Sequence, residues 1–266
     1  MPLHNTMNQT TVNCNTFRTE GVMFPIPIFS KKEVLSHKAE FELMEKAFNG
    51  KLPYAGNLHF SLLWAYELST HPKILDFITP ILGDDISVVG TLMLTKYPKT
   101  DNYVSWHQDG MNSKWDQNNS LTAWLALTNS NAGNGCMQVI PKSHENLLQE
   151  HVYFTDQKNM IRKGHRIATN VNEEEALDLE LRSGEMSIHH NSIIHGSKPN
   201  ASLQKRIGFI IRYINTKYVN PGTSVIYAKG NTKYDHLNKI DKPDAFGLKH
   251  SPEAYKDFLT QNIVIK

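Results

Sequence analysis

The sequence predicts a mainly β protein, a jelly roll of two antiparallel sheets with a side layer of N-terminal helices. Residues 17–82 carry apolar side chains at helical spacing between capping and stop signals. Residues 86–214 consist instead of short β-branched runs separated by Gly, Asn, Asp and Pro. One domain is expected over 17–266, because barrels and sandwiches of roughly 200–250 residues often fold as a unit. Residues 1–16, rich in Asn and Thr, are expected to form a disordered tail.

The expected helices have local signals at their ends. Ser30 and Glu33 fit a capping box, which favours a helix that continues to about Phe48. Pro72 suits the first turn of another helix, and Gly83 suits its end. The helices are expected over about 31–48, 58–68, 71–82 and 252–259.

The expected strands are short and are bounded by turn residues. They span 86–97, 104–109, 121–128, 136–140, 185–190 and 207–214. The Asn- and Gly-rich residues 131–135 predict a turn that joins two of them. Residues 146–178 form a long, polar and charge-rich segment, which we expect to pass over the mouth of the barrel.

Composition excludes several classes of function. A formal net charge of +2 with 20% charged residues gives no broad basic surface, so nucleic acid is not an expected partner. The chain has no run of roughly 18 apolar residues and no apolar secretory signal, so neither membrane insertion nor export is expected. Two cysteines, Cys14 and Cys136, are too few for a disulfide framework. We therefore expect a reducing, cytoplasmic location.

The pair His107 and Asp109 is the strongest chemical signal in the chain. Side chains alternate along a strand, so a histidine and a carboxylate two residues apart are expected on the same face. Adding His195 gives the two-histidine, one-carboxylate set that holds non-haem Fe(II) with open positions. Taken alone, such a pair is more often a strand-end histidine and a turn aspartate, so the interpretation depends on the distant partners.

The distant partners leave alternatives open. His189 and His190 compete with His195 as the metal ligand, and the glycine that follows His195 favours it by allowing close backbone approach. His190 is then expected to line the pocket. Arg206 lies where a β-branched run begins and suits a bidentate carboxylate clamp. By period two, Arg206 and Arg212 share a strand face, so Arg212 is the second candidate for this clamp.

Ordered motifs extend along most of the chain. They are Asp84-Asp85-Ile86, Thr95-Lys96-Tyr97-Pro98, Trp106-His107-Gln108-Asp109, 121–128, Asn134-Gly135-Cys136-Met137, 140–144, Ser183-Gly184-Glu185, His195-Gly196-Ser197 with Asn200, and Arg206. In these motifs, over roughly residues 21–213, the sequence resembles the phytanoyl-CoA dioxygenase superfamily of Fe(II)/2-oxoglutarate oxygenases. The region of Asn57-Leu58-His59 and His71-Pro72 resembles the branch of small-metabolite hydroxylases and non-haem iron halogenases.

The resemblance implies a double-stranded β-helix with Fe(II) held by His107, Asp109 and His195. In such enzymes O2 and the cosubstrate 2-oxoglutarate react at the iron, succinate and CO2 are released, and an unactivated C–H bond is oxidised. The outcome is hydroxylation, or radical desaturation or cyclisation, and the sequence does not separate these. In the halogenases of this family Gly or Ala replaces the carboxylate, so Asp109 disfavours halogenation. A non-catalytic, metal-binding jelly roll that senses a ligand is the other alternative.

The resemblance also implies where the cosubstrate and the substrate bind. The far carboxylate of 2-oxoglutarate would pair with Arg206, with Thr122 or Trp124 completing that pocket. The expected substrate is a small polar metabolite that bears a carboxylate, either amino-acid-like or a natural-product intermediate. Its candidate binding residues are Met111, Asn112, Lys114, Trp115, His190 and Arg212. For Lys114 and Trp115 an ordinary solvated loop is the alternative interpretation. The sequence predicts no oligomeric state.

Overall fold

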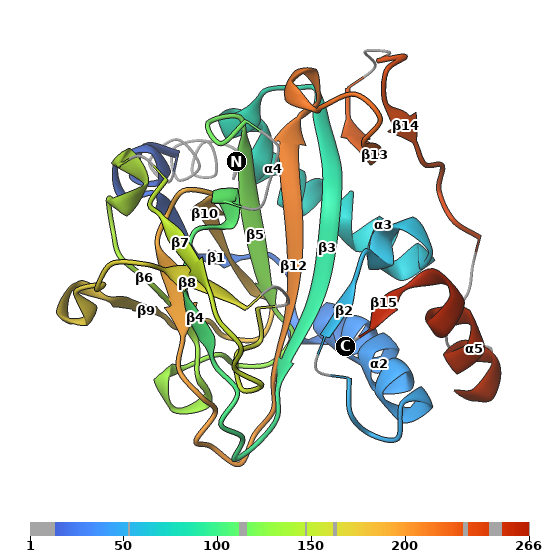
Figure 1. Cartoon of the computed structure of the whole chain (residues 1–266). Helices are drawn as coiled ribbons and strands as arrows, with labels where there is room; N and C mark the ends of the chain where they lie inside the picture. Colours follow the sequence, from blue (N-terminus) through green and yellow to red (C-terminus); the bar gives the residue numbers. More distant parts are fainter. Residues whose placement is uncertain are drawn as a thin grey trace, which may run out of the picture.

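The protein is represented by a computed structural model, which describes residues 14–52, 54–111, 116–146, 148–161, 164–230, 234–244 and 252–265. Within them, a large, mostly antiparallel sheet and a smaller antiparallel sheet pack face to face, and helices cover the outer face of the large sheet (Figure 1). The predicted jelly-roll fold class is confirmed. None of the helices in this part of the chain has the length and hydropathy that a membrane span requires.

The large sheet contains the longest strands. Its order is β1 (Val22–Pro27), β10 (Glu185–His190), β5 (Ser120–Ala126), β12 (Arg206–Asn215), β3 (Ile86–Lys96), β13 (Ser224–Lys229) and β14 (Asn238–Lys239). Beside β3 lies β2 (Tyr54–Gly56), which pairs with β15 (Val264–Ile265). Strand β13, which lies between β3 and β14, was not predicted from the sequence.

The smaller sheet faces the inner side of the large one. Its order is β4 (Val104–His107), β11 (His195–Ser197), β6 (Met137–Val139) and β9 (Leu177–Leu179). A separate hairpin of β7 (His151–Tyr153) and β8 (His165–Ile167) packs beside β4. The predicted turn 131–135 links β5 of the large sheet to β6 of the smaller one, so it crosses between sheets and closes no hairpin.

Alternation along the strands divides the buried side chains between two cores. On β3 and β12, Met93 and Phe209 pack with the helices, whereas Leu92 and Ile210 pack with the smaller sheet. Both faces of these strands are therefore buried, which explains why their sequences are nearly continuous runs of apolar residues. The candidate functional side chains point into the core between the two sheets.

The helices begin largely where the sequence predicts. Helix α2 (Lys31–Ala47) has the expected capping box, in which Ser30 N donates to Glu33 Oε2 at 2.8 Å. Helix α4 (Pro72–Leu82) has its proline in the first turn and ends at Gly83. Helix α5 (Pro252–Asn262) continues beyond its expected end.

The helix expected over 58–68 is divided into two elements. A 3-10 turn, η1 (Leu58–Phe60), is followed by α3 (Leu63–Ser69), because Leu62 adopts an extended conformation between them. The expected tail also differs at its end. Residues 14–20 are helical, and Cys14 is buried in the folded part. Residues 1–13 lie outside the described residues.

Candidate metal centre and its cavity

His107 and Asp109 converge, but not on one strand face as the alternation rule suggested. His107 is the last residue of β4, and Asp109 opens the 3-10 turn η2 (Asp109–Met111). The chain leaves the strand because Gln108 Nε2 donates to the Ser192 carbonyl at 2.7 Å. This turn places Asp109 Oδ1 at 3.8 Å from His107 Nε2.

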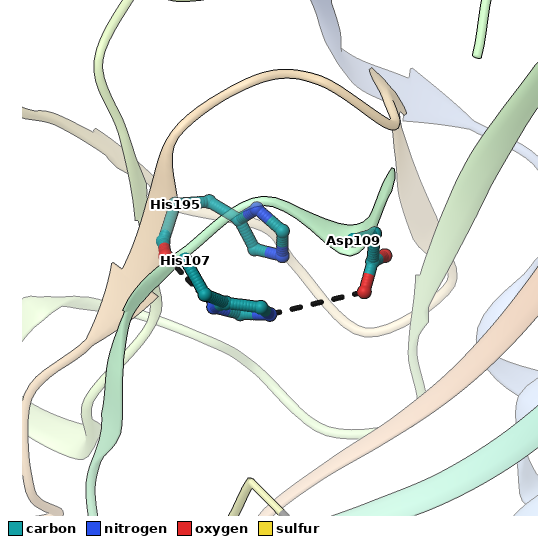
Figure 2. Close-up of side chains that lie close together, drawn as sticks. All are labelled: His107, Asp109 and His195. Atoms are coloured by element: carbon teal, nitrogen blue, oxygen red, sulfur yellow. Dashed lines mark hydrogen bonds and ion pairs between the residues drawn. The ribbon is translucent and has the colours of Figure 1, made fainter. Parts of the chain in front are cut away.

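His195 approaches from the neighbouring strand of the smaller sheet. It opens β11 and is the direct cross-strand partner of His107, with the two ring centroids 4.1 Å apart. One ligand atom from each of His107, Asp109 and His195 lies within 4.8 Å of the other two. Figure 2 shows the three side chains pointing toward a common centre.

Backbone carbonyls fix the orientation of both imidazoles. His107 Nδ1 lies 2.9 Å from the Ser105 carbonyl oxygen, and His195 Nδ1 lies 3.1 Å from that of Ile193. Carbonyl oxygens only accept hydrogen bonds, so this network assigns the ring hydrogen to Nδ1 in both residues. The Nε2 lone pairs are then available to a metal, which is how ligating histidines are usually held.

The charges at the centre suit a divalent cation. Burial would raise the pKa of Asp109, but the charge of Arg212 and the imidazoles of His107 and His189 hold it well below its usual range. Burial, and then the neighbouring imidazoles, hold the pKa of His195 well below its usual value. An ionised carboxylate and a neutral imidazole are the forms that bind metal, so the residues fit Fe(II).

A polar row on the large sheet faces the carboxylate of Asp109. His189 on β10, Thr122 on β5, Arg212 on β12 and Gly90 on β3 are successive cross-strand partners. Thr122 Oγ1 lies 3.1 Å from Asp109 Oδ2, and one Arg212 nitrogen lies 3.2 Å from Oδ1. Thr122, which the resemblance assigned to the cosubstrate pocket, therefore also contacts a metal ligand.

The metal centre opens into a cavity of about 680 Å³ between the two sheets. All three candidate ligands line it, together with Trp124, Arg206 and Arg212. The segment 146–178, which was expected to cover the mouth of the barrel, contributes Met160, Ile161 and His165 to the cavity wall.

Arg206 occupies a fully buried position in this cavity. Its exposed fraction is 1%, its guanidinium lies 5.3 Å from the centre of the Trp124 ring, and its Nε has no hydrogen-bond partner among the residues that the structure describes. Gly208 makes this arrangement possible, since a Cβ there would lie 2.1 Å from Trp124 Cζ2. Burial lowers the pKa of Arg206 to about 10, so it stays charged near pH 7.

The residues expected to follow the metal motif contribute little to the described cavity. Met111 belongs to η2, is half-buried and does not line the cavity. Three further candidates lie outside the described residues; they are Asn112, Lys114 and Trp115.

His189, not His190, faces the metal centre. Successive residues of β10 point to opposite faces, so His190 packs near Phe17 and His144, away from the cavity. This differs from the expectation that His190 lines the pocket. His189 is 2% exposed and lies 3.8 Å from Asp109 Oδ2, and within the described part of the chain neither of its ring nitrogens has a hydrogen-bond partner. Only the register of β10 distinguishes the two neighbours.

A jelly roll with two histidines and one carboxylate converging in its central cavity defines a class of non-haem metal proteins. Residues 34–208 match the phytanoyl-CoA dioxygenase (PhyH) family. The chain belongs to this family.

Curated relatives share about a quarter of the aligned residues with this chain. Peroxisomal phytanoyl-CoA dioxygenase of Bos taurus is 28% identical over 166 residues, which cover 60% of this chain and 49% of the relative. A probable alpha-ketoglutarate-dependent hypophosphite dioxygenase of Stutzerimonas stutzeri is 29% identical over 150 residues, covering 53% and 49%. The chain thus spans about half the length of these two relatives.

Solved structures support the fold over nearly the whole chain. The apo form of the non-heme monooxygenase ThoJ superposes with a TM-score of 0.77 at 24% identity, covering 94% of this chain and 99% of that one. The epimerase SnoN, solved with Fe3+, alpha-ketoglutarate and a nogalamycin compound, gives a TM-score of 0.66 at 18% identity, covering 80% and 87%.

Proposed function

We propose that this protein is an Fe(II)- and 2-oxoglutarate-dependent oxygenase that oxidises a C–H bond of a small, carboxylate-bearing metabolite. The observation that carries the proposal is the convergence of His107, Asp109 and His195 in a cavity that also contains a buried, incompletely bonded Arg206. When bound, iron and 2-oxoglutarate supply the oxidising chemistry, with release of succinate and CO2. The protein positions the substrate and limits the access of water.

Arg206 is the better candidate for the far carboxylate of the cosubstrate. It is buried, lines the cavity and has an unused Nε–H donor, so a bound carboxylate would satisfy it. Arg212 already contacts Asp109 and lies six residues further along β12, roughly 20 Å at strand spacing. A cosubstrate that binds the metal with one end and Arg206 with the other leaves Arg212 beside the metal centre.

Arg212 is accordingly the candidate that recognises the substrate. Its side chain is 28% exposed, and it lies at the cavity wall near Asn57 and Gly90. A guanidinium at this position can bind a substrate carboxylate while apolar walls, including Met160 and Ile161, contact the rest of the molecule. This placement supports a carboxylate-bearing substrate.

The test of the activity uses Fe(II) and 2-oxoglutarate without oxygen. Their complex should give a weak visible charge-transfer band, and in halide-free buffer His107→Ala and Asp109→Ala should abolish it. His236→Ala is the matched control, because His236 is exposed and lies outside the cavity. An unchanged band in both site variants would overturn the proposal.

The test of the substrate class is a metabolite panel scored by stimulated succinate release. Carboxylate-bearing compounds should stimulate turnover, and Arg212→Met should raise KM for them more than for their amide analogues. Succinate release with none of the panel would favour the ligand-sensing alternative. A chlorinated product from the unaltered protein would favour the halogenase alternative.

A further inference from the structure

Two buried basic side chains lie side by side at the Arg206 end of the cavity. Arg206 on β12 and Lys96 on β3 are direct cross-strand partners, and their exposed fractions are 1% and 0%. Among the residues that the structure describes, neither forms an ion pair with a carboxylate. Because the buried charge of Arg206 without a counter-charge is costly, and Lys96 beside it can accept a proton, this pair favours an anionic ligand.

Lys96 acts on the cavity through Ser197. Its Nζ donates a hydrogen bond of 2.6 Å to Ser197 Oγ and another to the carbonyl oxygen of Lys198. Ser197 lines the cavity, whereas Lys96 lies behind it. A hydroxyl that accepts a hydrogen bond from lysine keeps its own hydrogen for another acceptor. Ser197 can therefore donate into the cavity that Arg206 also lines.

The charge of Lys96 depends on its neighbours from three elements. Burial, and then the positive charge of Arg206 on β12, lower the pKa of Lys96 to about 6. Cys136, just before β6, is a neutral thiol, because burial raises its pKa to about 12. Ser197 and Lys198 contribute an uncharged hydroxyl and a carbonyl. Near pH 7 the amine is largely uncharged, and an anion beside Arg206 would draw a proton onto it.

We propose that Lys96 is a positioning residue for the cosubstrate: it orients the Ser197 hydroxyl toward the far carboxylate of 2-oxoglutarate and takes up a proton when this dianion binds. This inference rests on the proposed function. It assigns a role to a side chain that touches neither the metal nor the cavity. The proton comes from solvent, so no bond other than N–H is formed.

The first experiment compares two keto acids in the iron-loaded protein without oxygen. 2-Oxobutyrate keeps the chelating keto acid but lacks the far carboxylate. Lys96→Met should weaken 2-oxoglutarate binding about tenfold or more, the usual effect of losing a hydrogen bond to a charged group. The affinity for 2-oxobutyrate should stay within about twofold. Equal weakening of both would indicate a merely structural role and would overturn the inference.

The second experiment counts protons by titration calorimetry at pH 7 in two buffers of different ionisation enthalpy. The unaltered protein should take up close to one proton more on binding 2-oxoglutarate than Lys96→Met does. Lys205→Met is the matched control, since Lys205 pairs with Glu45 outside the cavity and should behave as the unaltered protein. Equal proton uptake in Lys96→Met and the unaltered protein would overturn the inference.

The two proposals fail in different ways. If the unaltered protein gives no charge-transfer band with 2-oxoglutarate, the proposed oxygenase function fails, and the role of Lys96 fails with it. If the band forms and Lys96→Met keeps both the preference for 2-oxoglutarate and the proton uptake, only the role of Lys96 fails. If Lys96→Met does not fold, Ser197→Ala replaces it and should show the same selective loss of 2-oxoglutarate affinity.

Discussion

Gly208→Ala should disturb both the stability of the protein and its binding of 2-oxoglutarate. A Cβ at Gly208 would lie 2.1 Å from Trp124 Cζ2 and 2.4 Å from Cε2, so the indole must move. Overpacking of this kind costs about 1–3 kcal/mol. At roughly 2–4 °C per kcal/mol for a domain of this size, Tm should fall by about 2–12 °C.

The movement of the indole should also weaken cosubstrate binding, because Trp124 contacts the Arg206 guanidinium, which we propose binds 2-oxoglutarate. The Arg206 guanidinium lies 5.3 Å from the Trp124 ring centre, and a cation–π contact is worth about 0.5–2 kcal/mol. Its loss corresponds to a decrease in affinity of about 2- to 30-fold. Thermal unfolding and anaerobic titration of the charge-transfer band measure the two effects.

Gly90→Ala is the matched control, since Gly90 also faces the cavity but its nearest neighbour would lie 3.8 Å from the new Cβ. It should leave both quantities nearly unchanged. In a Trp124→Phe background, Gly208→Ala should cost less, because the phenyl ring does not extend to the colliding indole atoms. Wild-type stability and affinity in Gly208→Ala, or an equal cost in both backgrounds, would refute this reasoning.

Three further predictions concern separate parts of the molecule. Arg206→Met should weaken 2-oxoglutarate binding by about 3 kcal/mol, over a hundredfold, in the anaerobic titration. Ser30→Ala should remove the cap of α2 and lower the free energy of unfolding by about 1 kcal/mol in denaturant titrations. Burial raises the pKa of Glu40 from 4.5 to about 7, so the stability that this carboxyl contributes is present below pH 4.5 and lost as pH rises through 7. Glu40→Gln should therefore stabilise the protein at pH 8 by about 1 kcal/mol, allowing for partial exposure, and have little effect at pH 4.5.

The alternation of side chains along a strand correctly predicted, from the sequence, that two arginines of β12 share a face. The sequence indicated that Arg206 and Arg212 share a face unless a bulge intervenes. The register shift between β12 and β3 lies beyond Arg212, where Val89 is the extra residue of β3, so both arginines line the cavity. Metal chemistry restricts the ligand types so strongly that the choice of His107, Asp109 and His195 needed only a few positional signals.

The same alternation rule did not predict the positions of side chains where the chain leaves a strand or where the register decides which face a residue occupies. Asp109 lies in a turn whose path is set by hydrogen bonds to 191–192, which are distant in sequence. The choice between His189 and His190 depends on the register of β10 against β5, which local spacing does not encode. Lys96 was visible only as part of a motif, because its pairing with Arg206 follows from the register between β3 and β12.

Asp109 is held differently from the two histidines, and this difference bears on the reaction. The histidines are fixed by backbone carbonyls of their own region, whereas the carboxylate is contacted by Thr122 and Arg212 on two strands of the opposite sheet. Arg212 therefore requires an anion at this position. With glycine or alanine at position 109, as in the halogenases that the sequence resembles, a free halide would have to supply this anion. This chain supplies the anion covalently, so charge balance around Arg212, and not only the identity of residue 109, supports the proposed oxygenation over halogenation.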